Sequence, residues 1–156
     1  MKLYHGTNVD FKEIDFRFCQ PYKDFGKGFY LTDILRQAKQ MAIRKSKVEG
    51  IPVVQEYEFD SSALNSSELR ICVFPETSAE WASFILNNRM KKKRFSHDYD
   101  IVVGPIADDG VVVQLNLYED GLITMEQLVA ALKFRKLTSQ YCFCTEKSLT
   151  YLRRIQ

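Results

Sequence analysis

The sequence has no long hydrophobic run and almost no excess charge of either sign. No segment approaches the ~18 consecutive apolar residues that a membrane-spanning helix needs, and the first residues carry no apolar signal region. We therefore expect a cytoplasmic protein without a membrane partner. The 22 basic and 20 acidic residues give a net charge of +2. This balance neither favours nor excludes a nucleic-acid partner, because a neutral domain can carry a basic face.

Cysteine is scarce, and repeats and low-complexity linkers are absent. The 4 cysteines include no CxxC pair, which fits neither a disulfide framework nor a zinc site, so no metal is expected. Cys142 and Cys144 have the spacing of one strand face and are expected to be buried, reduced thiols. A length of 156 residues with 46% hydrophobic content suits one packed domain over residues 1–156.

Hydrophobic periodicity predicts strands and helices in irregular order. Strands are expected at residues 1–5, 53–59, 69–74, 100–106, 111–117 and 140–144. Helices are expected at 33–48, with Thr32 and Asp33 as caps, from Ser78 onward, at 124–134 and at 146–155. Residues 8–27 lack a clear period. Because the elements do not alternate as regular βαβ units, this order predicts an α+β fold with mostly antiparallel pairing.

The first candidate site residues are His5 and Gly6, at the end of the first strand. A glycine directly after a strand histidine lets a ligand approach the backbone without a Cβ atom in the way. Thr7 and Asn8 then favour a turn. Taken alone, these residues more simply indicate a strand end with an ordinary half-buried histidine.

The second candidate is the segment Phe25-Gly26-Lys27-Gly28-Phe29-Tyr30. Two glycines around a lysine make a tight, permissive loop. The ring of Tyr30 could lie beside a bound aromatic cation, which contributes ~0.5–2 kcal/mol. The alternative is a hairpin turn with Tyr30 in the core. No GxGxxG, GKS or GKT phosphate-binding motif is present.

Together, His5-Gly6 and the Phe-Gly-Lys-Gly-Phe-Tyr segment before a helix resemble the ADP-ribosyltransferase superfamily. The resemblance is to the His-Tyr-Glu branch, shared by diphtheria toxin and the poly(ADP-ribose) polymerases, and to small bacterial toxin-like proteins. It runs from Leu3 to about Thr145 and rests on three short segments. It implies a split β-sandwich of mainly antiparallel strands with flanking helices, and NAD as the co-substrate.

The resemblance also implies residue roles. His5 would hydrogen-bond the adenosine ribose, the backbone of Gly6 would hold the nicotinamide carboxamide, and Tyr30 would pack against the nicotinamide ring. Met41 lies near the place of a second aromatic wall in the polymerases, although it fits the core-facing side of its helix equally well. The full set expected to bind NAD is His5, Gly6, Thr7, Gly28, Tyr30 and Met41.

The third motif position departs from the family pattern, because Gln140 stands where the triad has its glutamate. Cleavage of the bond between nicotinamide and ribose builds positive charge on the ribose, which a carboxylate stabilises. Glutamine keeps the hydrogen bonds without the charge. Chain elongation is therefore not expected, whereas single transfer by Gln140, His5 and Tyr30 stays open. A Gln140→Glu variant is expected to release more nicotinamide.

Several functions stay open on this sequence. The leading one is an NAD-dependent mono-ADP-ribosyltransferase that modifies a protein or nucleic acid, as the toxin of a toxin–antitoxin or phage-defence system. A toxin role would imply a protein antitoxin. The alternatives are a non-catalytic module that binds NAD or ADP-ribose and an NAD glycohydrolase. RNA 2′-phosphotransferases resemble the same fold, but their basic motifs are not evident here. The run Lys91–Arg94 is either a solvated loop or a guide for a polyanion.

Overall fold

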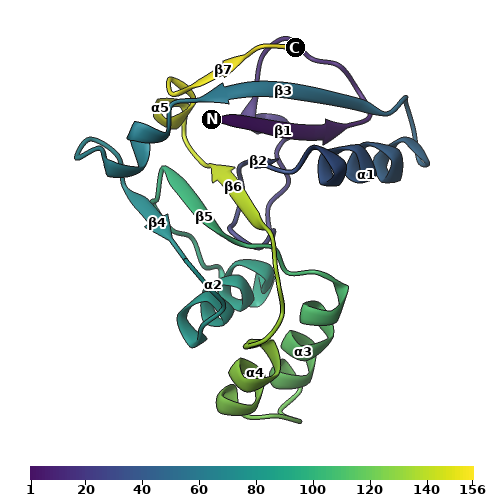
Figure 1. Cartoon of the computed structure of the whole chain (residues 1–156). Coiled ribbons are helices and arrows are strands. Elements are labelled where there is room, and N and C mark those ends of the chain that lie inside the picture. The colour runs from purple at the N-terminus through teal and green to yellow at the C-terminus, as the bar shows by residue number, and fades with distance from the viewer.

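Seven strands form one curled sheet in the computed structural model, which describes residues 1–156 (Figure 1). They are β1 (Lys2–Thr7), β2 (Phe29–Thr32), β3 (Val53–Phe59), β4 (Ile71–Val73), β5 (Ile101–Pro105), β6 (Ser139–Phe143) and β7 (Leu152–Arg154). Their spatial order is β4-β5-β6-β2-β1-β3-β7. Every neighbouring pair is antiparallel except β4 and β5. The predicted α+β class with mostly antiparallel pairing is confirmed.

Five helices flank this sheet. They are α1 (Leu35–Ser46), α2 (Ala79–Arg89), α3 (Asp109–Glu119), α4 (Met125–Leu132) and α5 (Glu146–Leu149). Short 3-10 helices lie at Phe16–Phe18, Ser61–Asn65 and Lys91–Lys93. Helix α1 packs on β1, β2 and β3, whereas α2, α3 and α4 gather at the other end of the molecule, below β6 (Figure 1).

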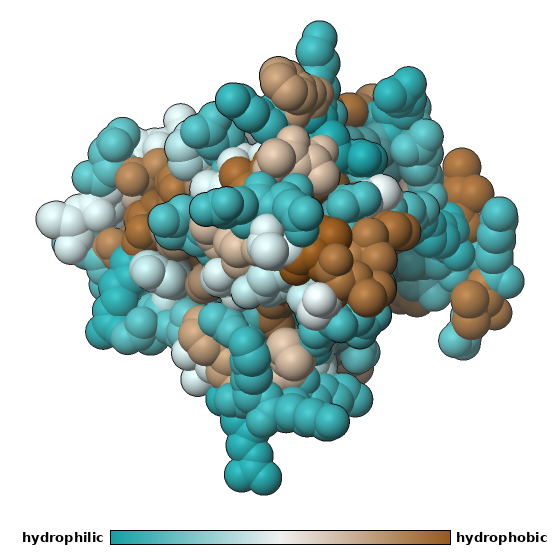
Figure 2. All heavy atoms as spheres, turned by 90° about the horizontal axis from the view of Figure 1, so that it is seen from below, coloured by the Kyte–Doolittle hydropathy of each residue, from teal (hydrophilic) through white to brown (hydrophobic).

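Two hydrophobic cores lie on the two faces of the sheet, because successive strand residues point to opposite sides. On β6, Tyr141 and Phe143 belong to the first core and Cys142 to the second. The first core also contains Leu3, Phe29, Leu31, Tyr57, Phe59, Ile101 and Val103. The second is filled from the helices by Trp81, Ile85, Val111, Leu115, Leu128 and Leu132. Seen from below, surface hydrophobic side chains form separate patches between hydrophilic ones (Figure 2).

The strand predicted at residues 111–117 is wrong, because this segment is helix α3. Its run of valines favoured a strand on local propensity. The carboxylate of Asp108 instead accepts the N–H of Val111 at 2.9 Å and caps the helix. Val111 and Leu115, one turn apart, are then buried in the second core.

The single helix predicted at residues 146–155 is also wrong in its second half. Thr145 and Ser148 form a capping box that begins α5, but the helix ends at Leu149. Leu152–Arg154 then pairs with β3 as strand β7. Pairing with the free edge of β3 stabilises these residues as a strand more than their weak helix propensity stabilises a helix.

The expected helix at 33–48 is present as α1, but its start differs from the prediction. The N-cap residue is Ile34, not Thr32 or Asp33. The hydroxyl of Thr32 accepts the N–H of Ile34 at 3.1 Å and donates to Gln37 at 2.8 Å. Thr32 thus ties the end of β2 to the first turn of α1.

Cys142 is buried, as expected, whereas Cys144 is only half-buried. Their sulfur atoms are 3.4 Å apart as free thiols. No three His, Cys, Asp or Glu side chains are grouped so that they could hold a metal ion. None of the helices is long and apolar enough to cross a membrane.

Candidate functional site

The sheet is split between β1 and β2. Strand β1 pairs with β3 along its whole length, and β2 does so with β6. Between β1 and β2, by contrast, only Tyr4 and Thr32 are paired. The two strands therefore separate just where His5 and Gly6 begin, and we call the space beyond Tyr4 the β1–β2 split.

The backbone N–H and C=O of Gly6 point into the β1–β2 split. Met1 and Phe59 exchange two backbone hydrogen bonds, of 2.7 and 2.8 Å. Hydrogen-bonded residues alternate along an antiparallel strand, and the register of β1 against β3 is unbroken. The odd-numbered residues of β1 consequently bond to β3, and the even-numbered ones face β2. Beyond Tyr4 this edge has lost its strand partner.

The imidazole of His5 bridges the β1–β2 split. Its Nδ1 lies 2.7 Å from the carbonyl oxygen of Tyr30 on β2. A carbonyl only accepts, so Nδ1 carries the proton. The ring packs against Phe29, with 4.4 Å between ring centroids, and edge-on against Phe11 at 5.9 Å.

This arrangement makes His5 a neutral hydrogen-bond acceptor. Burial lowers its pKa to about 4, aided by the positive charge of Lys45 and opposed by the bond to Tyr30. At pH 7 the ring is therefore uncharged, and Nε2 has a free lone pair. Nε2 forms no hydrogen bond within the chain, and every fully buried polar side-chain atom does have a partner. Nε2 is thus accessible from outside.

Tyr30 closes the glycine loop before β2. Its hydroxyl accepts the N–H of Phe25 at 2.9 Å and donates to the carbonyl of Gly26 at 2.7 Å. The ring stacks on Phe25 and lies at the border of the second core, half-buried. Burial raises the pKa of the phenol, so the hydroxyl stays protonated. The alternative of a hairpin turn with Tyr30 in the core is wrong, because no strand lies between β1 and β2 and the residue is only half-buried.

The two motif glycines serve close packing. A Cβ atom on Gly6 would lie 2.1 Å from the carbonyl oxygen of Ala38, so this glycine lets α1 approach β1. A Cβ atom on Gly28 would lie 2.4 Å from the sulfur of Cys142 on β6. The expectation that Gly6 leaves room for a ligand on its Cβ side is therefore wrong, because the helix occupies that side. Its backbone groups still face the split.

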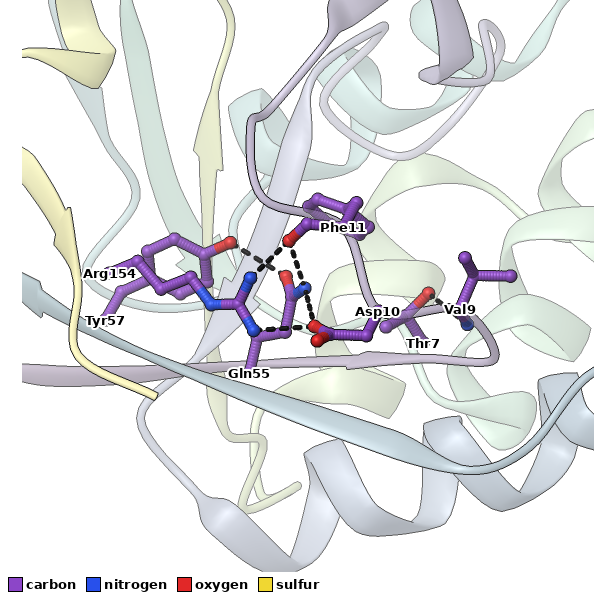
Figure 3. Close-up of polar contacts among 7 residues, drawn as sticks. All are labelled: Thr7, Val9, Asp10, Phe11, Gln55, Tyr57 and Arg154. Atoms are coloured by element: carbon purple, nitrogen blue, oxygen red, sulfur yellow. Dashed lines mark hydrogen bonds and ion pairs between the residues drawn. The ribbon is translucent and has the colours of Figure 1, made fainter.

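Thr7 and Met41 occupy different environments. Thr7 is buried at the end of β1, and its hydroxyl accepts the N–H of Val9 at 3.4 Å, as in a short turn (Figure 3). Met41 is 42% exposed on α1, since Ala38 and Ala42 alone form the buried face of that helix. Met41 is therefore not a core residue.

Gln140 lies on β6, opposite Thr32 of β2, and Tyr30 lies opposite Cys142. Tyr30 and Gln140 are therefore diagonal neighbours on the same face, a relation that separates residues by ~7–8 Å. His5 points to the other face, where it packs in the first core with Phe29. The structure thus brings Tyr30 next to each of the other two residues, but it does not bring His5 and Gln140 together.

One carboxylate beside Gln140 was not predicted. The amide Nε2 of Gln140 donates to Oδ2 of Asp24 at 3.3 Å, and Arg89 of α2 forms an ion pair with Oδ1 of Asp24 at 3.3 Å. Burial raises the pKa of Asp24, while Arg89 and Gln140 act in the opposite direction. Asp24 lies in the irregular segment 8–27, and the only sequence signal was its position directly before the glycine loop.

Lysines without ion-pair partners lie near the same loop. Burial and the positive charge of Lys23 lower the pKa of Lys45. Lys27 and Lys45 are both close to the thiol of Cys19, whose pKa is raised by burial. None of the three lysines forms an ion pair within the chain. This region therefore favours an anion.

A polar network around the buried side chain of Gln55 holds the segment that covers His5 (Figure 3). The amide Nε2 of Gln55 donates to Asp10 at 2.8 Å and to the carbonyl of Phe11 at 2.9 Å. Its oxygen accepts the hydroxyl of Tyr57 at 2.8 Å. Arg154 of β7 binds the same carboxylate at 2.6 Å and the same carbonyl. These contacts fix Phe11 over the imidazole.

Two surface hollows lie away from the β1–β2 split. One has a volume of about 420 Å³ and is lined by Met1, Phe59, Ser61, Tyr151 and Arg153. A hollow of about 160 Å³ lies at the start of β6, lined by Gln37, Asp108, Lys136 and Thr138. We base the candidate site on the β1–β2 split nevertheless, because it combines an open acceptor, free backbone groups and nearby cations.

Comparison with known proteins gives one match. No curated protein and no solved structure matches the chain. A family model matches residues 1–154, nearly the whole sequence. The chain therefore belongs to the family described as "protein of unknown function (DUF3990)".

Proposed function

We propose that this chain is an NAD-dependent mono-ADP-ribosyltransferase with an ADP-ribosyltransferase-like split β-sandwich, and that it modifies a protein or a nucleic acid. The observation that carries the proposal is the β1–β2 split. There a neutral His5 with an open acceptor lies beside Gly6, whose backbone donor and acceptor lack a strand partner.

Each group in the split matches a part of NAD. Nε2 of His5 would accept a ribose hydroxyl, which an imidazole protonated on both nitrogens could not do. The N–H and C=O of Gly6 would pair with the carboxamide of nicotinamide as a neighbouring strand pairs with its partner. The half-buried ring of Tyr30 and the exposed side chain of Met41 would provide apolar walls.

The anionic part of NAD would lie near the lysines. Lys23, Lys27 and Lys45 offer positive charge that no ion pair within the chain takes up, and the partial burial of Lys45 strengthens its interaction with a diphosphate. Gly28 and Thr7 would shape the rim of the site rather than contact the reacting atoms, because Gly28 packs on β6 and Thr7 ends β1.

The test uses NAD labelled on its adenylate half, with the full chain and a cell lysate. We expect the label on macromolecules and free nicotinamide in equal amount. His5→Ala should weaken NAD binding about tenfold, since one hydrogen bond contributes about 0.5–1.5 kcal/mol, and should reduce labelling. Lys133→Ala, an exposed cation after α4, serves as the control and should behave as wild type. Wild type that neither binds NAD nor releases nicotinamide would contradict the proposal.

The same experiment separates the alternatives. Reversible binding of NAD without nicotinamide release would identify a binding module, for which the uncharged Gln140 is the supporting observation. Nicotinamide release with free ADP-ribose and no labelled macromolecule would identify a glycohydrolase. Sensitivity of the labelled product to nuclease or to protease would name the acceptor. A toxin role predicts that expression in bacteria arrests growth in wild type and not in His5→Ala.

A further inference from the structure

Asp24 and Gln140 form a pair that no sequence motif predicts. They are 116 positions apart, and the amide of Gln140 points its Nε2 at the carboxylate of Asp24 across 3.3 Å. A carboxylate only accepts, so this contact fixes which end of the amide faces it. The amide oxygen of Gln140 forms no hydrogen bond within the chain. It is left free to accept one from a ligand.

The carboxylate of Asp24 is held in a setting that suits a catalytic acid or base. Its side chain is 17% exposed, and its one ion-pair partner, Arg89, is itself 35% exposed. The hydroxyl of Tyr30 is bonded to the two residues that follow Asp24 in the chain. Asp24 therefore lies beside two of the three residues that the proposed reaction needs.

We propose that Asp24 and Gln140 together replace the single glutamate of the triad, an inference that rests on the proposed function. The amide oxygen of Gln140 accepts a hydroxyl of the nicotinamide-bearing ribose. The carboxylate of Asp24 faces the positive charge that develops on that ribose. The missing negative charge is thus supplied from the glycine-loop side of the site rather than from β6.

The bond between the ribose C1′ and the nicotinamide nitrogen breaks, and its electron pair leaves with neutral nicotinamide. A hydroxyl or amine of the acceptor, or water, attacks C1′. Asp24 takes the proton of that nucleophile and later releases it to solvent. NAD and the nucleophile give the ADP-ribosylated product, nicotinamide and one proton.

An isosteric variant tests the charge. Asp24→Asn should lower the rate of nicotinamide release by roughly 100-fold, the range for loss of a general base, while NAD affinity measured by calorimetry changes less than about threefold. Asp98→Asn is the matched control. It removes another carboxylate from an aspartate–arginine pair, with Arg70, but at the surface, and it should leave the rate unchanged.

Moving the charge to its partner is the sharper test. In the double variant Asp24→Asn/Gln140→Glu, the carboxylate returns to the family position with an amide beside it, and the rate should recover at least tenfold over Asp24→Asn. Gln140→Glu alone places two carboxylates at hydrogen-bond distance, where they share a proton. The sequence predicts that Gln140→Glu raises the rate of nicotinamide release. We therefore expect this increase to be small while Asp24 is present.

The pH profile gives an independent readout. The charged or titratable groups facing Asp24 are Arg89, Lys23 and Tyr30, and burial raises the pKa of Tyr30, so its hydroxyl stays neutral. Since burial raises the pKa of Asp24, the wild-type rate should fall on the acid side at a pH above that of an ordinary aspartate. Asp24→Asn should lose this limb of the profile.

The outcomes separate the two proposals. Wild type without NAD binding or nicotinamide release would end the proposed function. An active wild type with an equally active Asp24→Asn would end only this inference. The Asp24→Asn variant could instead fold, bind NAD and have low activity that the double variant does not restore. This result would assign Asp24 a structural role and would also overturn the inference. If Asp24→Asn fails to fold, the double variant and the wild-type pH profile decide.

Discussion

At the scale of single residues, the state of His5 follows from its surroundings. Phe11 and Phe29 cover part of the ring, and the carbonyl of Tyr30 fixes the proton on Nδ1. Protonating Nε2 would place a charge among aromatic rings. The folded protein therefore binds this second proton less readily than the unfolded chain does.

Acid should accordingly destabilise the protein through His5. The pKa is about 4 in the folded state against 6.5 for an imidazole in water, so the stabilising contribution is present above pH 6.5 and is lost as the pH falls toward 4. A shift of this size corresponds to something on the order of 3 kcal/mol. Urea unfolding at pH 7, 5 and 4 should show wild type losing more stability than His5→Gln. Parallel losses in both proteins would contradict this prediction.

Gly6 should tolerate no side chain. An added Cβ atom meets the backbone oxygen of Ala38 at 2.1 Å, and backbone cannot turn aside as a side chain can. We expect Gly6→Ala to lower the free energy of unfolding by about 3 kcal/mol or more, at the upper end for overpacking. Urea unfolding is the measurement.

Gly121→Ala is the matched control for that substitution. Its φ of +74° strains an alanine, but nothing lies within 4 Å of the added atom. The loss should be smaller, about 1–2 kcal/mol. Equal losses in the two variants would show that α1 moves away from β1 without cost.

Two features of single residues, the packing of Gly6 and the contact of Asp24 with Gln140, could not be predicted from the sequence. The pattern around Gly6 is equally compatible with ligand approach and with helix packing, and only the position of Ala38 decides between them. Asp24 was missed because its partner Gln140 is 116 positions away. Local spacing contains no information about such a contact. The spacing of Cys142 and Cys144, in contrast, was sufficient to place the two thiols side by side, because they are only two positions apart at the end of β6.

At the scale of elements, strong caps and clear periodicity were predictable. Ser78 begins α2 by accepting the N–H of Trp81 at 3.1 Å, as expected. The strand prediction for residues 111–117 was wrong because β-branched residues favour strands locally, while a cap and two packed side chains favoured a helix. Strand β7 was not predicted because its pairing with β3 depends on the sheet as a whole.

The cap of α3 should be measurable. Asp108→Ala removes the acceptor for the N–H of Val111 and the partner of Arg135 at 3.1 Å. We expect a loss of about 1 kcal/mol in thermal unfolding, the usual contribution of an N-cap. Asp109 is exposed and lies one position later. Asp109→Ala should lower the stability by only about a few tenths of a kcal/mol, the contribution of a charge near a helix start. Equal effects would show that Asp108 does not act as the cap.

At the scale of the whole molecule, the α+β class was predictable and the strand order was not. The order places β6 next to β2 and leaves β1 joined to β2 at one position. That topology creates the β1–β2 split, and no pattern within a single strand encodes it. The motif residues lie on β1, β2 and β6, and the pairing of these strands determined that His5 and Gln140 face opposite sides.

NAD should stabilise the folded molecule if the proposed site is correct. A ligand that binds only the folded state at 100 times its Kd adds about 2.7 kcal/mol. For a domain of this size, this should raise the melting temperature by several degrees. His5→Ala should show a smaller rise at the same NAD concentration, and Lys133→Ala should match wild type. A melting temperature that NAD leaves unchanged in wild type would contradict the proposed site.

The contact between Arg154 and the segment over His5 has a consequence for biosynthesis. The guanidinium that binds Asp10 and the carbonyl of Phe11 belongs to Arg154, which is translated 143 positions after Phe11 (Figure 3). Domains fold as units during synthesis. A nascent chain that has not yet reached Arg154 therefore lacks the contacts that this side chain gives to the segment over His5.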